Sequence, residues 1–296
     1  MKISIQSLEY PKSLRKIEKP PNQLYYKGNI ELLRMPGIAI IGSRKCTKYG
    51  EKMAKKFSKE LSLQSLVIIS GMAKGIDSFA HMESIETTGN TIAVLPCGFN
   101  NIYPKENINL YKQILENNGL VLTEYEENEE ATSKKFLERN RIISGLAIGI
   151  LVIEGGYRSG TSVTARLAKK QEKNIFCIPS SLENSKGITP NILIKEGAFL
   201  VTNIDDIINK YPNLNLKKID FTKVEEKNNS IKKEYQDIYN ILDEEKTIHI
   251  NEIVQKLKIE INEVNYKLTM LELEGKIVSL PGNNFRKKWI YIKKEN

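Results

Sequence analysis

The chain has 296 residues, which predicts about two domains and is long enough for a sizeable hydrophobic core. Its three cysteines, Cys46, Cys97 and Cys177, are far apart, and its two histidines are His81 and His249. So few histidines and such widely spaced cysteines disfavour a His/Cys metal site and a Ser-His-Asp triad. We therefore expect reduced thiols and no bound metal, and hydrolytic chemistry has little support. A formal charge of +9 favours a polyanionic partner such as nucleic acid, although solvated lysines alone produce a similar excess.

The N-terminal residues contain no apolar stretch that resembles a signal segment, and no run of about 18 apolar residues occurs anywhere. We therefore expect a cytoplasmic protein without a membrane span. Residues 1–35 contain Pro11, Pro20 and Pro21 and show little periodicity. They predict an extended or short-helix lead-in packed on the core.

From residue 37 onward, short apolar runs rich in Val and Ile alternate with amphipathic stretches. The runs occupy residues 37–42, 66–71, 91–98, 120–125, 149–156, 174–180 and 198–203. Because they lack polar alternation, they predict strands buried on both faces, and hence a parallel sheet covered by helices on each side. We expect a doubly wound α/β domain over residues 36–211, with ligands beyond the carboxyl ends of the strands.

The first strand ends in a turn made by Gly42, Ser43 and Arg44, where the dinucleotide fingerprint Gly-x-Gly-x-x-Gly is missing. We expect the turn to bring backbone amides to the start of a helix, with Arg44 as a bidentate donor. Such a turn binds a phosphate. The alternative is a tight turn with Arg44 on the surface.

The second turn places Ser70, Gly71 and Lys74 at another strand end. Asp77 follows near the next helix start, where its charge suits the helix dipole, and we interpret it as a cap rather than an acid catalyst. His81 lies one helical turn later on the same side. We expect a packed, hydrogen-bonded core histidine there rather than a base.

The third turn contains Tyr103 and Pro104, which present Lys105 and Asn107. An aromatic ring beside a cation suits single-stranded nucleic acid, because bases stack on rings while the backbone requires positive charge. Phe99 and Tyr103 also fit the alternative of ordinary packing residues.

Arg139, Asn140 and Arg141 are predicted at the start of a later helix. The two arginines either grip phosphates or stabilise the domain by pairing with Glu124 and Glu154, and we expect a mixture of both roles.

The fifth strand is followed by a glycine-rich turn, after which Ser159, Gly160 and Thr161 begin a helix with exposed amides and hydroxyls. This is the best small-anion site that the sequence offers. A Walker A motif is missing, so NTP hydrolysis has no support.

A second domain follows a polar segment, residues 212–230, that predicts a linker. Residues 231–296 predict three helices and a hairpin, which together make a winged helix. The apolar positions expected to share a face of the third helix are Val264, Leu268, Leu271 and Leu273.

The docking helix of this module is predicted at residues 261–275, and its wing carries Arg286, Lys287 and Lys288. The helix also carries Glu263, Glu272 and Glu274. Duplex DNA and a protein therefore both remain possible partners of the module.

Six spaced motifs together resemble the DNA-processing protein A family, DprA or Smf. They lie at residues 42–44, 70–81, 103–107, 138–146, 159–168 and 193–201 and cover nearly the whole α/β part. The resemblance implies a Rossmann-like core that binds single-stranded DNA without catalysis or a cofactor. It further implies that the protein protects incoming DNA and loads the RecA recombinase onto it during natural transformation.

By the same resemblance, Arg44 and Lys105 are the principal DNA-contacting cations. The residues that we expect to contact DNA are Gly42, Ser43, Arg44, Ser70, Gly71, Lys74, Lys105, Asn107, Arg139, Asn140, Arg141, Ser159, Gly160 and Thr161. The resemblance places a homodimer surface at Ile188, Ile192, Leu193 and Leu200. Longer relatives carry a helical N-terminal domain, for which 35 residues before the core leave no room.

Two other functions remain open from the sequence. The loop after Glu154 faintly resembles the Pro-Gly-Gly-x-Gly-Thr loop of phosphoribohydrolases that cleave nucleoside monophosphates, with Glu154 as the acid, but Arg158 and Ser159 are inserted before Gly160. The second alternative is a transcription regulator whose α/β part senses a ligand and whose winged helix reads duplex DNA.

Overall fold

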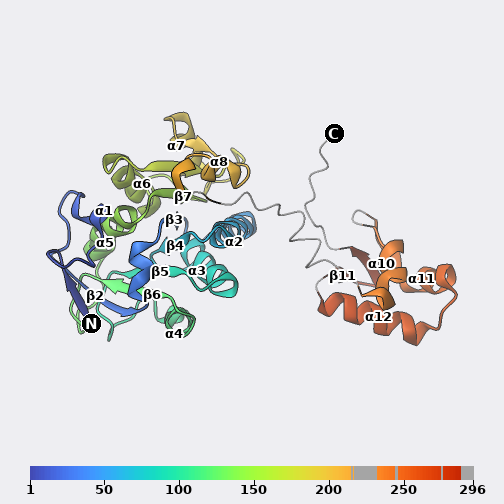
Figure 1. Ribbon diagram of the computed structural model, residues 1–296. Helices are drawn as coiled ribbons and strands as arrows, with labels where there is room; N and C mark the ends of the chain where they lie inside the picture. Colours follow the sequence, from blue (N-terminus) through green and yellow to red (C-terminus); the bar gives the residue numbers. More distant parts are fainter. Residues whose placement is uncertain (215, 217–231, 244–245, 275, 288–296) are drawn as a thin grey trace. The chain divides into compact units, whose positions relative to one another are not determined.

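The computed structural model describes residues 1–214, 216, 232–243, 246–274 and 276–287 (Figure 1). The chain divides into two compact units, Met1–Lys217 and Lys218–Asn296. Apart from a short 3₁₀ turn, Pro212–Leu214, and residue 216, the predicted linker lies outside the described residues.

Nine strands form one sheet in the larger unit, in the order β1-β2-β6-β5-β4-β3-β7-β8-β9. They are β1 (Lys2–Ser4), β2 (Gln23–Gly28), β3 (Gly37–Ile41), β4 (Val67–Ser70), β5 (Thr91–Leu95), β6 (Leu120–Thr123), β7 (Gly149–Val152), β8 (Asn174–Cys177) and β9 (Phe199–Leu200). The strands from β3 to β9 pair in parallel. Each apolar run of the sequence forms one of these strands, so the predicted doubly wound parallel sheet is confirmed.

Helices cover both faces of the sheet (Figure 1). One face carries α2 (Lys48–Leu63), α3 (Ile76–Thr87) and α4 (Ile108–Glu116), and the other carries α1 (Lys12–Arg15), α5 (Ser133–Leu146) and α6 (Gly160–Lys170). The remaining helical segments are α7 (Ile188–Lys195), α8 (Asp205–Ile208), η1 (Ile30–Arg34) and η2 (Lys105–Asn107). This arrangement leaves the ends of the strands open for the connecting loops.

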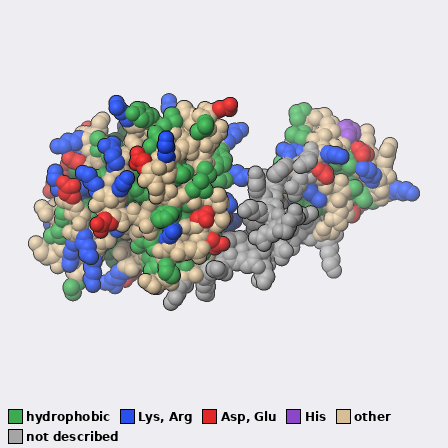
Figure 2. Space-filling model, turned by 90° about the horizontal axis from the view of Figure 1, so that it is seen from above, with side chains coloured by type: hydrophobic (Ala, Val, Ile, Leu, Met, Phe, Trp, Pro, Cys, Tyr) green, Lys and Arg blue, Asp and Glu red, His purple; other side chains and the backbone are tan. Residues whose placement is uncertain are grey.

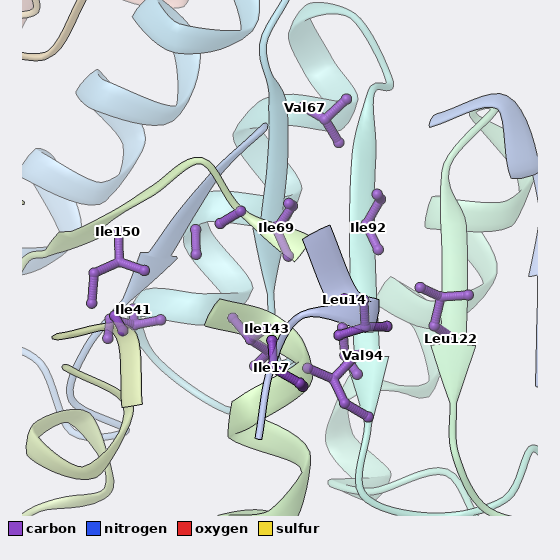
Figure 3. Packing of buried hydrophobic residues seen from close by; sticks show 14 of the residues in the cluster. Leu14, Ile17, Ile41, Val67, Ile69, Ile92, Val94, Leu122, Ile143 and Ile150 are labelled. Atoms are coloured by element: carbon purple, nitrogen blue, oxygen red, sulfur yellow. The ribbon is translucent and has the colours of Figure 1, made fainter. Parts of the chain in front are cut away.

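The core consists of alternate strand side chains on each face of the sheet. On one face, Ile69, Val94 and Ile150 belong to a cluster that includes Ile143 of α5 (Figure 3). On the other face, strand residues that alternate with these pack against α4. Because strands with two covered faces bury every side chain, these strands read as continuous apolar runs in the sequence.

The first 35 residues are part of the sheet, which the sequence did not predict. β1 and β2 extend it beyond β6 in antiparallel orientation. Leu14 and Ile17 pack on α5 at Gly145, where a Cβ atom would lie 2.8 Å from Leu14 Cδ1 (Figure 3). The lead-in therefore packs on the core as expected, but two of its segments are strands, of which β1 forms the edge of the sheet.

The smaller unit contains η4 (Lys233–Tyr235), α10 (Gln236–Ile241), α11 (Ile250–Leu257) and α12 (Ile261–Leu273), with the strands β10 (Ile248–His249), β11 (Ile277–Leu280) and β12 (Asn284–Lys287). The strands pair antiparallel in the order β10-β12-β11. Three helices and this small sheet form the predicted winged helix.

The third helix of the smaller unit, α12, buries three of its four predicted core residues, Val264, Leu268 and Leu271. Leu273 is 77% exposed, so its assignment to the core face was wrong. Residues at i, i+4 and i+7 share a helix face, whereas Leu273 follows Leu271 by only two positions and points elsewhere.

In the part of the chain that the structure describes, no helix is long and apolar enough to cross a membrane.

Candidate nucleic-acid interface

β3 and β7 lie side by side at the centre of the sheet, but the chain leaves them in opposite directions, from β3 to β4 and from β7 to β8. Their carboxyl ends therefore form the topological switch point of the sheet, where open α/β sheets bind ligands. A cleft of about 750 Å³ opens there. It is lined by Ile41, Gly42, Ser43, Arg44, Ala73, Asp77, Tyr103, Ser133, Phe136, Leu137, Arg139, Asn140, Ile143, Gly156, Tyr157, Ser159, Gly160, Thr161, Thr164 and Lys186.

The structure brings together eight of the fourteen predicted DNA-contacting residues in this cleft. They are Gly42, Ser43, Arg44, Arg139, Asn140, Ser159, Gly160 and Thr161. The other six do not line it, namely Ser70, Gly71, Lys74, Lys105, Asn107 and Arg141. The cleft thus unites the turns after β3 and β7 with one side of α5.

The turn after β3 does not lie directly at a helix start, which corrects the prediction. The helix α2 begins at Lys48, after Thr47 as its N-cap. Glu154 lies at this N-terminus, where its carboxylate accepts hydrogen bonds from Thr47 N at 2.9 Å and Thr47 Oγ1 at 2.6 Å. A protein carboxylate therefore occupies the N-terminus of α2, and Arg44 is the exposed cation of the turn after β3.

Glu154 is fully buried and does not line the cleft. Besides its bonds to Thr47, it accepts a hydrogen bond from Asn184 Nδ2 at 3.2 Å. It has a structural role at the start of α2, and the geometry gives no support to Glu154 as the acid of a phosphoribohydrolase.

Arg44 is exposed and lies over the ring of Phe136, which in turn contacts Tyr103. Its Cζ atom lies 4.7 Å from the centroid of the Phe136 ring, a cation–π distance. The rings of Phe136 and Tyr103 meet edge to face, with centroids 5.3 Å apart. Tyr103 is 44% exposed, so a cation and an accessible aromatic face lie together at the cleft.

Arg139 is 3% exposed, and its predicted contact with DNA is corrected. Its guanidinium donates to the carbonyl oxygens of Gly71, at 2.7 Å, and Val94. Burial lowers the pKa of Arg139 to about 10, and the carboxylate of Asp77 opposes this shift, so the side chain stays charged at neutral pH. Arg139 therefore joins the ends of β4 and β5 at the floor of the cleft.

The second turn is built around this buried arginine. Gly71 is required because a Cβ atom there would lie 2.4 Å from Arg139 Nη1. Ser70 is fully buried and donates to the carbonyl oxygen of Ile40, so neither Ser70 nor Gly71 is a surface contact as predicted.

Asp77 lies in the first turn of α3 rather than at its N-cap, which is Gly75. Its carboxylate accepts from the amides of Gly71 and Ala73 in the preceding loop. Burial raises the pKa of Asp77, and the guanidinium of Arg139 opposes this rise. His81 is fully buried with Nδ1 2.7 Å from Thr91 Oγ1, so the predicted core histidine is confirmed.

The helix that carries Arg141 begins earlier than predicted, because Thr132 caps it by accepting from Lys135 N. Arg141 consequently lies in the interior of α5, where it forms a two-point ion pair with Glu124 at 2.6 and 2.7 Å. The predicted pairing with Glu124 is confirmed, and that with Glu154 is not seen.

In the third turn, Tyr103 lines the cleft, whereas Lys105 and Asn107 lie outside its lining. Lys105 is exposed at the start of η2. Lys74 pairs with Glu106 at 2.7 Å, and Asn107 donates from Nδ2 to Met72 O at 2.8 Å. Phe99 is 7% exposed, so the alternative interpretation of Phe99 as an ordinary packing residue is confirmed.

The turn after β7 ends at α6 with its first amides open to the cleft. Ser159 caps the helix by accepting a hydrogen bond from Ser162 N. Gly160 has no atom within 4 Å of a Cβ position, so a ligand can approach its backbone closely. The helix start and its dipole favour an anion here.

Phe136 is the main cleft residue that the sequence analysis missed. Besides Arg139, the residues of α5 that line the cleft are Ser133, Phe136, Leu137, Asn140 and Ile143. Their spacing of three and four residues places them on one helix face, and this periodicity was the available signal. The sequence analysis also missed Tyr157, which is 65% exposed. The Cζ atom of Arg158 lies 5.2 Å from the centroid of its ring.

The exposed face of α12 in the smaller unit is acidic. Glu260, at the N-cap, and Glu263 are both exposed. The single basic residue of α12, Lys267, is held between Asp237 at 2.8 Å and Glu263 at 2.9 Å. Arg286 and Lys287 lie on β12, whereas Lys288 lies outside the described residues.

Basic side chains are spread over the face of the larger unit seen in Figure 2, interleaved with hydrophobic ones. Within the described residues, no group of three or more His, Cys, Asp or Glu side chains is arranged to hold a metal ion.

Two family models match this chain. The model for DNA recombination-mediator protein A matches residues 2–212, and that for the DprA winged helix domain matches residues 226–283. The chain belongs to the DprA family. A DprA relative that extends over most of the chain is the protein Smf of Escherichia coli, which is 33% identical over 285 residues, 94% of this chain and 75% of that protein.

Solved DprA structures share the fold. The X-ray structure of DprA from Streptococcus pneumoniae is 40% identical with a TM-score of 0.68 and covers 71% of this chain and 74% of that one. DprA from Helicobacter pylori, described for its single-stranded DNA binding mode, is 33% identical with a TM-score of 0.63 and covers 72% of this chain and 96% of that one. Membership places this chain among DNA recombination and processing proteins.

Proposed function

We propose that this protein binds single-stranded DNA in the cleft at the switch point of its sheet and does so without catalysis. The observation that carries the proposal is the meeting of Arg44, the open start of α6 and the rings of Phe136 and Tyr103 in one cleft. Cations and helix amides attract phosphates, and exposed rings stack unpaired bases. The binding mode described for the Helicobacter pylori relative supports the same ligand class.

Lys105 extends this interface in the proposal. It is exposed and follows Tyr103 by two residues, so it adds positive charge next to a cleft-lining ring. Several phosphate contacts of this kind make affinity fall steeply with salt.

We further propose that the protein protects incoming DNA and passes it to the RecA recombinase in natural transformation. The family's role as recombination mediators and the six motifs quoted above support this step. RecA filament formation on an oligonucleotide, followed with and without this protein, tests it.

A homodimer is proposed through the edge of the sheet at β9. Ile188, Ile192 and Leu200 are 36%, 40% and 47% exposed, which is unusual for large apolar side chains so close together in the sequence. Leu193 packs partly against the core, so it contributes less to this surface than predicted.

The binding proposal is tested with fluorescently labelled oligo-dT and a duplex of equal length, titrated at two salt concentrations. We expect tighter binding of oligo-dT and a steep loss of affinity at the higher salt. A chain ending at Lys217, the boundary of the larger unit, serves as the second sample. It should retain most of the single-strand affinity. If that truncation abolished all binding, the cleft would not be the site that holds DNA.

A further inference from the structure

The helix α6 presents positive charge along one exposed face. Its sequence contains Arg166, Lys169 and Lys170 and no acidic residue. Residues three and four positions apart share a helix face, so these three exposed side chains lie together. Lys169 lies 3.9 Å from Glu196, whereas Arg166 and Lys170 form no ion pair with any residue that the structure describes. Most of the charge on this face therefore has no carboxylate partner among those residues.

The helix dipole explains only part of this arrangement. Cations are favoured in the last turn of a helix, which accounts for Lys169 and Lys170. Arg166 lies before the last turn, where the dipole gives it no advantage. On α2, by comparison, the mid-helix Lys55 pairs with Glu51 at 2.7 Å. The position of Arg166 thus favours an external anion as its partner.

Two more cations continue this face beyond the end of α6. Lys173 is half-buried in the turn after the helix, and Lys16 is exposed at the C-cap of α1. Burial lowers the pKa of Lys173, and the positive charge of Lys16 acts in the same direction. Glu172, also in this turn, is exposed. Two like charges this close repel each other, and an anion bound beside them relieves the repulsion.

The residues Arg166, Lys169, Lys170, Lys173 and Lys16, here called the α6 stripe, continue from the cleft. The first turns of α6 line the cleft through Gly160, Thr161 and Thr164. The 11 residues of the helix extend about 16 Å from there.

The far end of the α6 stripe lies at the opposite end of the sheet. β8 begins at Asn174, directly after Lys173, and runs parallel to β7. The cleft lies at the carboxyl end of β7, so the turn that carries Lys173 lies at the amino end of β8. The α6 stripe therefore leads away from the cleft across the surface of the larger unit.

The rim of the sheet on the β6 side of the cleft is acidic. The loop after β6 exposes Glu126, Glu127 and Glu130. Its backbone is fixed on the connection that carries Tyr103, because Gly98 N donates to Glu129 O at 2.8 Å. Carboxylates repel phosphates, so a strand that extends beyond the cleft is directed toward α6 rather than toward this loop.

We propose that the α6 stripe is a second contact surface, which carries the continuation of the DNA strand from the cleft along α6 toward the amino end of β8. Its ligand is the sugar-phosphate backbone, because α6 offers cations and its sequence contains no aromatic residue on which a base stacks. The contact is independent of base sequence. This inference rests on the proposed binding of single-stranded DNA.

The test compares the affinities of the full chain for oligo-dT of 12 and of 6 nucleotides at low salt. Arg166→Gln with Lys170→Gln should weaken binding of the 12-mer about tenfold, because phosphate contacts are lost. The 6-mer, which occupies the cleft, should bind within twofold of the wild type. Each lost contact should also reduce the slope of log affinity against log salt by about 0.7, for the 12-mer only.

A matched control removes the same charge from the other face of the sheet. Lys59→Gln with Lys112→Gln changes exposed positions of α2 and α4. This variant should keep the wild-type ratio of the two affinities. If it lowered the ratio as far as the substitutions on α6 do, the effect would be one of net charge, and the α6 stripe would be overturned.

The remaining outcomes separate the α6 stripe from the proposed function. An unchanged 12-mer affinity in the α6 variant, or an equal loss for both lengths, would overturn the α6 stripe and leave the cleft as the binding site. A loss confined to a 12-base-pair duplex would overturn it as well, because the ligand would then be duplex DNA. If the wild type bound neither oligo-dT, the proposed function itself would fail, and the α6 stripe with it.

Discussion

The switch-point cleft of the larger unit is a place where α/β folds commonly bind ligands, and the third helix of the smaller unit is the element with which winged helices commonly bind DNA. In the cleft, Arg44 and the start of α6 present positive charge and open amides. On α12, Glu260 and Glu263 face solvent and Lys267 is held by carboxylates. The fold thus provides a surface, while the side chains on it decide whether a polyanion is attracted.

The largest effect should follow charge reversal in the larger unit. Arg44→Glu with Lys105→Glu is expected to weaken oligo-dT binding about 100-fold at low salt, since two attractive contacts become repulsive. Fluorescence anisotropy measures this loss. Lys59→Glu with Lys112→Glu is the matched control, because both lysines are exposed and neither lines the cleft. A similar loss in the control would show that affinity depends only on net charge. It would contradict a specific role of the cleft in DNA binding.

The next effect separates a structural cation from a ligand-binding one. Arg141→Ala should lower the free energy of unfolding by about 2 kcal/mol, because it leaves the half-buried Glu124 unpaired. Urea denaturation measures this change. Oligo-dT affinity at 25 °C should stay within twofold of the wild type. A large loss of affinity in a folded Arg141→Ala protein would instead indicate that Arg141 contacts DNA.

Mild acid should lower the stability of the larger unit because of the buried His81. Burial lowers the pKa of His81 to about 3, and the nearby charge of Arg139 acts in the same direction. Below pH 6.5 the unfolded chain binds a proton that the folded protein does not, so stability falls as the pH falls. From pH 6.5 to 5 this amounts to about 1.5 kcal/mol. Urea denaturation of the wild type and His81→Gln at both pH values checks the prediction, and an equal pH dependence in the two proteins would contradict it.

The smallest effect concerns the smaller unit. Glu260→Gln with Glu263→Gln should raise duplex affinity about threefold at low salt, because the first residues of a docking helix lie nearest to DNA. Gel shifts with a duplex oligonucleotide measure the change. Should these substitutions weaken duplex binding, the two glutamates would be contacts rather than repulsive groups, and the contrast with the cleft would disappear.

The sequence predicted the elements whose side chains are all buried and missed those whose structure depends on a distant partner. The central strands β3, β4, β5, β6 and β7 appear as apolar runs because helices cover both of their faces, whereas the apolar run of β9 lies at an edge where Leu200 is 47% exposed. β1 and β2 lack such runs, since each lies at or near an edge and pairs with segments far away in the chain.

The candidate site was predictable where residues lie in the turns between a strand end and the next helix. Ser43, Arg44, Ser159 and Thr161 were identified in this way and all line the cleft. The residues of α5 were misjudged because Thr132 starts the helix earlier than expected. The burial of Arg139 against strand-end carbonyls is a tertiary contact without a local sequence signal.

Glu154 does not line the cleft, but it stabilises the loop that carries Arg44. Its hydrogen bonds with Thr47 fix the C-terminal end of this loop, and they form without any ligand. In the proposed binding mode, a DNA strand meets a preorganised loop, and little conformational entropy is lost in ordering that loop on association.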